Sequence, residues 1–269
     1  MELWQALILG LVEGLTEYLP VSSTGHLLVV QRLLGIEASE AANAFAIVIQ
    51  GGAIAAVLLL YHRRVAEMAL GLAGRAEGGR RLAVGLVVAF LPAAIAGLAL
   101  EERIEALLFG PWPVVAAWAV GGVFLVWIAP RIVQRQGKPI EEVTWQIALV
   151  IGLAQCAALW PGVSRSLATI LGALAAGMSL AAAVEFSFLL GLLTLGAATA
   201  YKALDSGAAM VEAYGALELA VGFGVACLSA VIAVRWMVAW LGKRGLGIFG
   251  WWRIAAAAAV AAMLLAGAL

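Results

Sequence analysis

The sequence predicts an all-α polytopic membrane protein that forms a single integral membrane domain over residues 1–269. The first observation is composition: 65% of the 269 residues are hydrophobic, only 12% are charged, and the mean hydropathy is +1.06. Such a composition is typical of a chain that faces lipid. The second observation is that the apolar residues fall into discrete segments, several of which are long enough to cross a bilayer.

The apolar segments lie at roughly 3–19, 24–35, 43–61, 82–100, 112–129, 144–160, 166–178, 183–201, 216–241 and 252–268. A helix needs about 20 residues to cross a hydrocarbon core, so the second and seventh segments are too short. Each of these two follows a break that contains proline, at Pro20 and at Pro161. We therefore expect six transmembrane helices and two re-entrant helical hairpins, residues 1–35 and 144–178, with tips that are buried or line a wet cavity.

The two hairpins resemble each other in sequence. With the chain shifted so that Ser22 meets Ser164, Val21 meets Val163 and Glu13 meets Gln155. This similarity predicts a five-segment internal repeat with halves at approximately 1–130 and 144–269. Because each half has one hairpin and an odd number of crossings, we expect the halves to be inverted relative to each other. In inverted repeats, substrates bind where the broken helices meet.

Loop charges predict the orientation of the chain. If the N-terminus is outside, twelve basic residues lie inside and three outside, which agrees with the positive-inside rule. The expected inside set is Arg63, Arg64, Arg75, Arg80, Arg81, Arg131, Arg135, Lys138, Arg235, Lys243, Arg244 and Arg253, and the expected outside set is Arg32, Arg103 and Lys202. Both termini then lie outside, and Arg165 is the only basic residue left at membrane depth.

The first break contains two carboxylates in an apolar setting. Glu13 and Glu17 are four residues apart on a helical stretch and share one face. Like charges this close need a metal ion, an arginine or a shared proton between them. Helix capping alone would account for the neighbouring hydroxyls, but it does not require two carboxylates on one face. We therefore interpret this break as a functional site.

Hydroxyl groups follow directly after Pro20, which ends the first helix. Ser22, Ser23 and Thr24 are suited to begin a second helix, and the free N–H groups of a helix start bind phosphate well. Ser23 and His26 are three residues apart on that helix and can share a face. They would then fit a nucleophile and its proton-transfer partner.

The second break places Arg165 among hydroxyls, at another predicted helix start. A guanidinium in this setting binds phosphate through paired hydrogen bonds. A structural salt bridge from Arg165 to Glu13, Glu17 or Glu185 is the alternative interpretation, and a mixed role is also open. The hydroxyls of this break are Ser164, Ser166 and Thr169.

These motifs resemble those of the undecaprenyl-diphosphate phosphatases of the bacitracin-resistance (BacA) type. The resemblance rests on Glu13-x-x-x-Glu17, on residues 20–26 and on residues 161–169, and it extends over essentially the whole chain. It implies a bacterial inner-membrane enzyme, with its site open to the outside, that dephosphorylates undecaprenyl diphosphate and recycles the lipid carrier for peptidoglycan synthesis. It also implies that activity depends on a divalent cation. Our hypothesis is that this cation is Mg²⁺ or Ca²⁺ and that Glu13 and Glu17 hold it.

The resemblance further implies the roles of individual residues. The functional residues are Glu13, Glu17, Ser23, His26 and Arg165, and the residues that line the phosphates are Ser22, Thr24, Ser164, Ser166 and Thr169. In one mechanism Ser23 attacks the terminal phosphorus while His26 handles the proton. In the other, water attacks and Ser23 is only a ligand.

Transport of undecaprenyl phosphate across the membrane is the competing function, because inverted repeats with broken helices are also typical of carriers. The expected partners are the polyprenyl lipid and the surrounding membrane lipids, with no nucleic acid. The sequence leaves the oligomeric state open, with a homodimer as one option.

Overall fold

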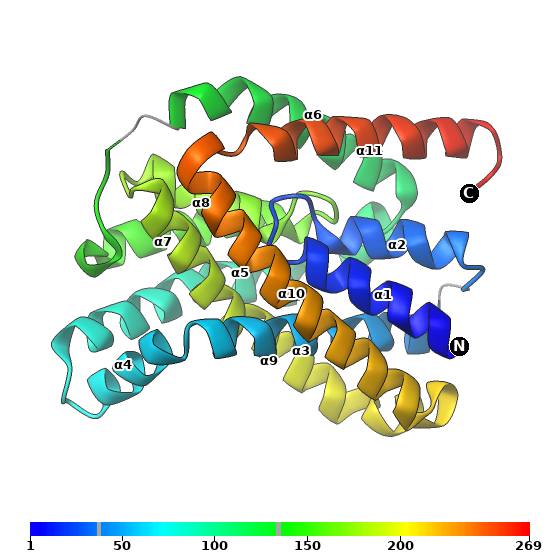
Figure 1. Cartoon of the computed structure of the whole chain (residues 1–269), viewed down its shortest axis with the longest axis horizontal. Coiled ribbons are helices and arrows are strands. Elements are labelled where there is room, and N and C mark those ends of the chain that lie inside the picture. Colours follow the sequence, from blue (N-terminus) through cyan, green and yellow to red (C-terminus); the bar gives the residue numbers. More distant parts are fainter. Residues whose placement is uncertain (37–38, 133–135) are drawn as a thin grey trace.

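The computed structural model describes residues 1–36, 39–132 and 136–269, and this part of the chain is helical apart from loops and one isolated bridge between Lys138 and Met178 (Figure 1). Arg135 and the side chain of Lys202, which enter the orientation prediction, lie outside the described residues and side chains. The helices are α1 (Leu3–Thr16), α2 (Ser23–Leu33), α3 (Glu40–Leu60), α4 (His62–Leu72), α5 (Glu77–Leu108), α6 (Pro111–Ile132), η1 (Ile140–Glu142), α7 (Trp145–Gln155), η2 (Cys156–Leu159), α8 (Arg165–Ala175), α9 (Leu180–Tyr214), α10 (Ala216–Arg244) and α11 (Gly247–Leu265).

Five of these helices are long and apolar enough to cross a membrane: α5, α6, α9, α10 and α11. A sixth span arises if α3 and α4 are counted together, although the chain bends by 79° between them. The architecture is therefore that of a polytopic membrane protein, as the composition predicts. The bend itself was not expected, since the sequence predicts one crossing over 43–61 that simply ends near His62.

Two helical hairpins, α1–α2 and α7–α8, contain helices too short to cross the membrane. Their chain reversals lie at the two proline-containing breaks. At each reversal the residue before the second helix has an unusual backbone: Ser22 has φ 71° and ψ 99°, and Ser164 has φ 77° and ψ 116°. In the described part of the chain these are the two non-glycine residues with positive φ. Such strained residues persist only where the surroundings hold them firmly.

The hairpins pack against long helices from the other half of the chain. Helix α1 lies along α10 (Figure 1), and α7 lies along α5. The contact of α1 with α10 is close because both helices carry glycine there: a Cβ at Gly10 would overlap the Gly222 carbonyl. Small residues allow such backbone approach between membrane helices. Helix α3 also contacts α9 and α10, and α6 contacts α11.

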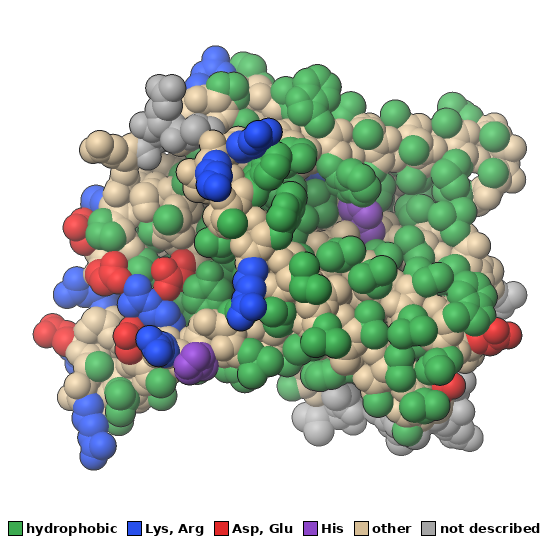
Figure 2. Space-filling view, in the orientation of Figure 1, with side chains coloured by type: hydrophobic (Ala, Val, Ile, Leu, Met, Phe, Trp, Pro, Cys, Tyr) green, Lys and Arg blue, Asp and Glu red, His purple; other side chains and the backbone are tan. Residues whose placement is uncertain are grey.

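A charged cluster at one end of the molecule joins α4, η1 and α9. Arg64 Nε lies 2.7 Å from Glu185 Oε1, its Nη2 lies 2.6 Å from Glu141 Oε1, and its Nη1 lies 3.1 Å from Glu67 Oε2. Figure 2 shows acidic and basic side chains gathered near α4, while hydrophobic side chains cover much of the remaining face. Glu185 is therefore the partner of Arg64, and the alternative pairing of Glu185 with Arg165 is wrong.

Candidate active site

A cavity of about 690 Å³ lies where the two hairpin tips meet. One tip contributes Ser22, Ser23 and Thr24, and the other contributes residues 161–162, Ser164 and Arg165. The remaining wall is largely apolar and comes mainly from α5, η2 and α9, with the polar side chains of Gln50 on α3 and Gln155 on α7. The two breaks thus meet at one cavity, as the repeat predicts, and this cavity is the candidate site.

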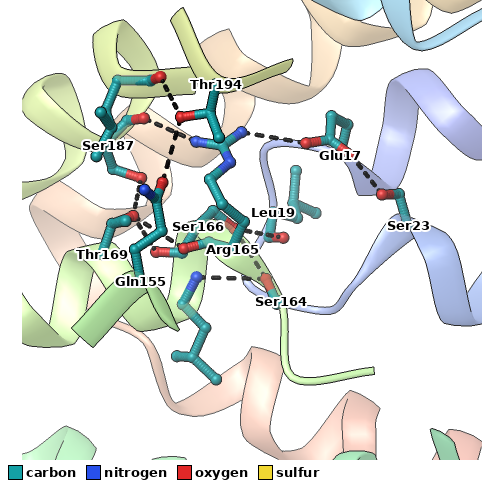
Figure 3. Close-up of polar contacts among 12 residues, drawn as sticks. Glu17, Leu19, Ser23, Gln155, Ser164, Arg165, Ser166, Thr169, Ser187 and Thr194 are labelled. Atoms are coloured by element: carbon teal, nitrogen blue, oxygen red, sulfur yellow. Dashed lines mark hydrogen bonds and ion pairs between the residues drawn. The ribbon is translucent and has the colours of Figure 1, made fainter. Parts of the chain in front are cut away.

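A continuous polar chain connects the two tips at this cavity (Figure 3). Arg165 Nη2 donates to Glu17 Oε1 at 3.1 Å, and the Ser23 hydroxyl donates to the other oxygen of the same carboxylate. Arg165 Nη1 donates to the Ser187 carbonyl at 2.8 Å, and the Tyr18 ring lies 5.5 Å from the guanidinium carbon. These contacts fix the guanidinium at the cavity wall. Each Nη group keeps a second N–H, which can donate to an anion.

Two helices begin at the cavity and present backbone N–H groups there. Helix α2 starts at Ser23 and α8 starts at Arg165, and each has eleven residues. The first N–H groups of a helix have no intrahelical acceptor, and the helix dipole favours an anion at this end. With the arginine between them, the two helix starts give a site suited to phosphate.

Glu13 lies one helical turn before Glu17 and is fully buried. Neither of its carboxylate oxygens has a hydrogen-bond partner in the described part of the chain. A buried carboxylate without a partner is costly, so the geometry fits a cation or a proton between Glu13 and Glu17. Carboxylate oxygens are the ligands that Mg²⁺ and Ca²⁺ prefer. Within residues 1–36, 39–132 and 136–269, no cluster of three or more His, Cys, Asp or Glu side chains is placed to bind a metal, so further ligands would have to be hydroxyls, water or substrate.

The predicted phosphate-lining hydroxyls divide into two groups. Ser22, Thr24 and Ser164 line the cavity. Ser166 is fully buried and donates to the Leu19 carbonyl at 3.0 Å. Thr169 is also fully buried, and its hydroxyl lies 2.7 Å from that of Ser187 (Figure 3). The last two therefore join the second hairpin to its neighbours instead of facing the cavity.

His26 lies away from Ser23, and both of its ring nitrogens are engaged. Nδ1 lies 2.7 Å from the Ser22 carbonyl, and Nε2 accepts from Trp252 Nε1 at 2.9 Å. The ring also packs against Trp118, with the ring centroids 4.7 Å apart. The hydroxyl proton of Ser23 instead points to Glu17. The structure thus brings Glu13, Glu17, Ser23 and Arg165 together but leaves His26 behind the first tip.

Sequence reasoning missed Arg253, which it placed in an inside loop. The residue instead lies in α11 and is fully buried behind the two tips, where it donates to backbone carbonyls of both. Arg165 is therefore not the only arginine inside the helix bundle. Sequence reasoning also assigned no role in the site to Gln155, a cavity-lining residue that accepts from Thr194 at 3.3 Å. The repeat did give a signal for Gln155, because it aligns this residue with Glu13.

Comparison with known proteins gives a consistent result. Residues 6–259 match the family model described as bacitracin resistance protein BacA. The chain is 46% identical to an undecaprenyl-diphosphatase of Sorangium cellulosum, over 96% of this chain and 85% of that protein. It is 45% identical to undecaprenyl-diphosphatase 2 of Rhodospirillum rubrum, over 93% and 91% of the two chains. It is 44% identical to an undecaprenyl-diphosphatase of Ectopseudomonas mendocina, over 95% and 92%.

Proposed function

The chain belongs to the bacitracin resistance protein BacA family, and from this premise we propose that it hydrolyses undecaprenyl diphosphate to undecaprenyl phosphate and inorganic phosphate. This reaction recycles the lipid carrier for peptidoglycan synthesis and confers resistance to bacitracin. The observation that carries the proposal is the contact of Arg165 with Glu17 across the two hairpin tips, beside a hydroxyl and two helix starts. Phosphoryl transfer needs mainly positioning and charge neutralisation, which this arrangement supplies.

The diphosphate binds between the tips in this proposal. Arg165 and the N-terminal N–H groups of α2 and α8 hold its non-bridging oxygens, while the hydroxyls of Ser22 and Thr24 add further donors. Ser164 lines the site, but its hydroxyl is hydrogen-bonded to that of Ser166, which in turn donates to the Leu19 carbonyl. These groups are fixed before the substrate arrives, because the guanidinium is already held by Glu17 and by the Ser187 carbonyl. Fixed donors stabilise the charge that develops on the transferred phosphoryl group.

The nucleophile is Ser23 or a water molecule, and in either case Glu17 is placed to accept its proton. In the covalent route, a bond forms from Ser23 Oγ to the terminal phosphorus and the bond from that phosphorus to the bridging oxygen breaks. Undecaprenyl phosphate leaves with that oxygen, and water then hydrolyses the phosphoserine to free phosphate. In the direct route, water attacks the terminal phosphorus. A phosphoserine trapped at position 23 would establish the first route, and an active Ser23→Ala variant would exclude it.

Glu13 and Glu17 would hold the divalent cation, Mg²⁺ or Ca²⁺. The carboxylate oxygens of Glu13 support this assignment, because they are buried and have no hydrogen-bond partner among the residues that the structure describes. When bound, the cation would neutralise phosphate charge and polarise phosphate oxygens. The two carboxylates then keep complementary roles, since Glu17 also orients Arg165 and Ser23.

The apolar part of the cavity suits the beginning of the prenyl chain. Its walls include Phe90, Ala93 and Leu98 on α5 and Leu195 and Ala198 on α9. Leu98 is 80% exposed, so this wall continues onto the outer surface of the helix bundle. A polyprenyl tail can therefore run from the phosphate site along α5 into the lipid.

The finer topology is part of the proposal: six crossings, two re-entrant hairpins and two inverted halves. Helix packing supports the inverted repeat, because equivalent helices of the two halves make equivalent contacts. The packing of α1 against α10 corresponds to that of α7 against α5, and the packing of α3 against α10 corresponds to that of α9 against α5. The matching backbone of Ser22 and Ser164 supports it as well. The loop charges favour both termini and the cavity mouth outside a bacterial inner membrane, with Arg253 removed from the inside set.

The test is phosphate release from undecaprenyl diphosphate by the detergent-purified protein, with and without a chelator. We expect Glu17→Gln and Arg165→Ala each to lower kcat by about 100-fold to 1,000-fold, because each removes preorganised charge from the site. Chelation is expected to stop release by the wild type, and added Mg²⁺ or Ca²⁺ to restore it. A folded wild type that releases no phosphate with either ion would overturn the proposal and favour transport of the lipid phosphate.

A further inference from the structure

Arg253 joins the tips of both hairpins through their backbone carbonyls. Its Nη1 donates to Val163 at 3.0 Å and to Pro20 at 3.4 Å, and its Nη2 donates to Gly162 at 2.9 Å and to Ala117 on α6 at 2.8 Å. The side chain is fully buried and does not line the cavity. It therefore holds the two tips from behind, on the side away from the proposed substrate.

The guanidinium of Arg253 is a buried charge with no carboxylate to balance it in the described part of the chain. Four backbone carbonyl oxygens accept its hydrogen bonds instead of a carboxylate. A buried cation is costly unless its donors are well satisfied. If this position served only the stability of the fold, an apolar side chain of similar size would serve it at lower cost. The arrangement thus indicates a function that requires a charge and a planar set of donors.

The contacts of Arg253 are close in sequence to the groups of the site. Pro20 lies three residues after Glu17 and three before Ser23, and Val163 lies two residues before Arg165. Because the N–H and C=O of a trans peptide point in opposite directions, a guanidinium bound to the Val163 carbonyl directs the Ser164 N–H away from itself. Any shift of either tip would move these groups directly.

We propose that Arg253 is a positioning residue that fixes the separation and orientation of the two tips, so that Glu17 and Ser23 on one tip and Arg165 on the other act on the same diphosphate. This inference rests on the proposed phosphatase function. It also accounts for the strained backbone at Ser22 and Ser164, because each lies within two residues of a carbonyl that Arg253 binds.

Gly121 offers a way to move the guanidinium without removing it. A Cβ at this position of α6 would overlap Arg253 Nη2 and lie 3.0 Å from its Cζ. Gly224 on α10 provides a matched control, because a Cβ there would meet nothing within 4 Å. Arg64 provides a second control, since it is an arginine bound to three carboxylates far in sequence from both tips.

The experiment measures kcat, KM and the unfolding temperature of Arg253→Gln, Arg253→Lys and Gly121→Ala in detergent, with Gly224→Ala and Arg64→Gln as controls. We expect Arg253→Gln to lower kcat by about 100-fold with KM within about threefold, because the tail still binds while the reacting groups lose their alignment. Arg253→Lys retains more activity than Arg253→Gln but less than the wild type, since lysine lacks the planar fork. Gly121→Ala lowers kcat by about tenfold, and both controls keep kcat near the wild-type value.

A folded Arg253→Gln variant with kcat within threefold of the wild type would overturn the inference, and so would an equal loss in Arg64→Gln. If neither Arg253 variant folds, the kcat of Gly121→Ala is compared with that of Gly224→Ala. Equal kcat values of these two variants would overturn the inference. If the wild type itself releases no phosphate, the proposed function fails, and the inference is tested by binding of inorganic pyrophosphate, followed as a rise in unfolding temperature. We then expect Gly121→Ala to bind pyrophosphate at least about tenfold more weakly than Gly224→Ala, in line with the loss of one or more charged hydrogen bonds. Equal binding of pyrophosphate by the two variants would overturn the inference.

Discussion

Arg165 of the second hairpin donates to Glu17 of the first, with 3.1 Å between Nη2 and Oε1. The sequence left two interpretations of Arg165 open, a structural salt bridge and a phosphate ligand. The structure shows the salt bridge, to Glu17, and the phosphate role is part of the proposed function. Glu17 holds one edge of the guanidinium, the Ser187 carbonyl holds another, and each Nη keeps a second N–H that can donate to an anion. A single contact therefore both joins the two halves of the chain and orients the arginine.

Glu13 provides a first prediction. Because both of its buried carboxylate oxygens lack partners among the described residues, Glu13→Gln should weaken binding of the divalent cation more than it lowers the stability of the fold. We expect the cation concentration for half-maximal phosphate release to rise by about tenfold or more, in keeping with the loss of a charged ligand. The measurement is a titration of Mg²⁺ and of Ca²⁺ against activity. An unchanged midpoint together with an unchanged kcat would show that Glu13 holds no cation.

Trp252 provides a second prediction, which concerns His26. Trp252→Phe keeps an aromatic ring but removes the N–H that donates to His26 Nε2. If His26 acts by holding the Ser22 carbonyl through Nδ1, the freed ring loses its fixed orientation, and kcat/KM falls by up to about tenfold, the equivalent of one hydrogen bond. Wild-type activity in Trp252→Phe, combined with loss of activity in His26→Gln, would instead support a direct proton-transfer role for a mobile imidazole.

The hairpins could be predicted from sequence because their signals are local. Pro20 and Pro161 disfavour a continuous helix and each precedes a short apolar segment, and a segment of about a dozen apolar residues cannot cross a bilayer. Val21-Ser22 also matches Val163-Ser164 in type and place. Carboxylates and an arginine in such segments are rare enough to mark a site. The convergence of the two breaks then followed from the repeat.

The position of Arg253 could not be predicted, because its partners are backbone carbonyls. Any residue supplies a carbonyl, so a contact with Val163, 90 positions away in sequence, or with Pro20, 233 positions away, leaves no mark in side-chain type. The loop-charge argument therefore assigned Arg253 to an inside loop. His26 and Trp252 are separated by 226 positions, and the i,i+3 spacing of Ser23 and His26 could not reveal that competing contact.

Glu141 provides a third prediction, at the charged end of the molecule. The hydrogen bond from Arg64 Nη2 holds the pKa of the Glu141 carboxyl below its usual range. A lowered folded-state pKa stabilises the protein above the ordinary carboxyl pKa of about 4.3, and this contribution is lost as the pH falls through the lowered value. We expect the wild type to unfold at a slightly higher temperature than Glu141→Gln at pH 6–7. The difference should be small, because solvent-exposed ion pairs contribute little to stability.

The same comparison at lower pH supplies the control for Glu141. As the pH falls below the ordinary carboxyl pKa and then through the lowered pKa of Glu141, the difference in unfolding temperature between wild type and Glu141→Gln should decrease progressively, because the wild-type carboxyl becomes neutral as well. A difference that does not change with pH would mean that the glutamine perturbs packing, and that the ion pair with Arg64 does not stabilise the fold.

Gly191 on α9 provides the last prediction, because the Arg165 guanidinium lies directly against it. A Cβ at Gly191 would lie 2.7 Å from both Nη1 and Nη2, closer than carbon and nitrogen can pack. Gly191→Ala should therefore push the guanidinium out of its contacts with Glu17 and the Ser187 carbonyl. We expect kcat/KM to fall by about tenfold to 100-fold, since a displacement of this size misaligns a group that neutralises phosphate charge.

Gly196, five residues further along α9, is the matched control for Gly191. A Cβ at Gly196 would meet nothing within 4 Å, so Gly196→Ala should keep full activity and gain up to about 1 kcal/mol of helix stability. Both substitutions add one methyl group to the same helix, and only the one at Gly191 reaches Arg165. Equal activities of the two folded variants would show that the position of this guanidinium does not limit catalysis, whereas the expected difference would tie the rate to the contact between Arg165 and Glu17.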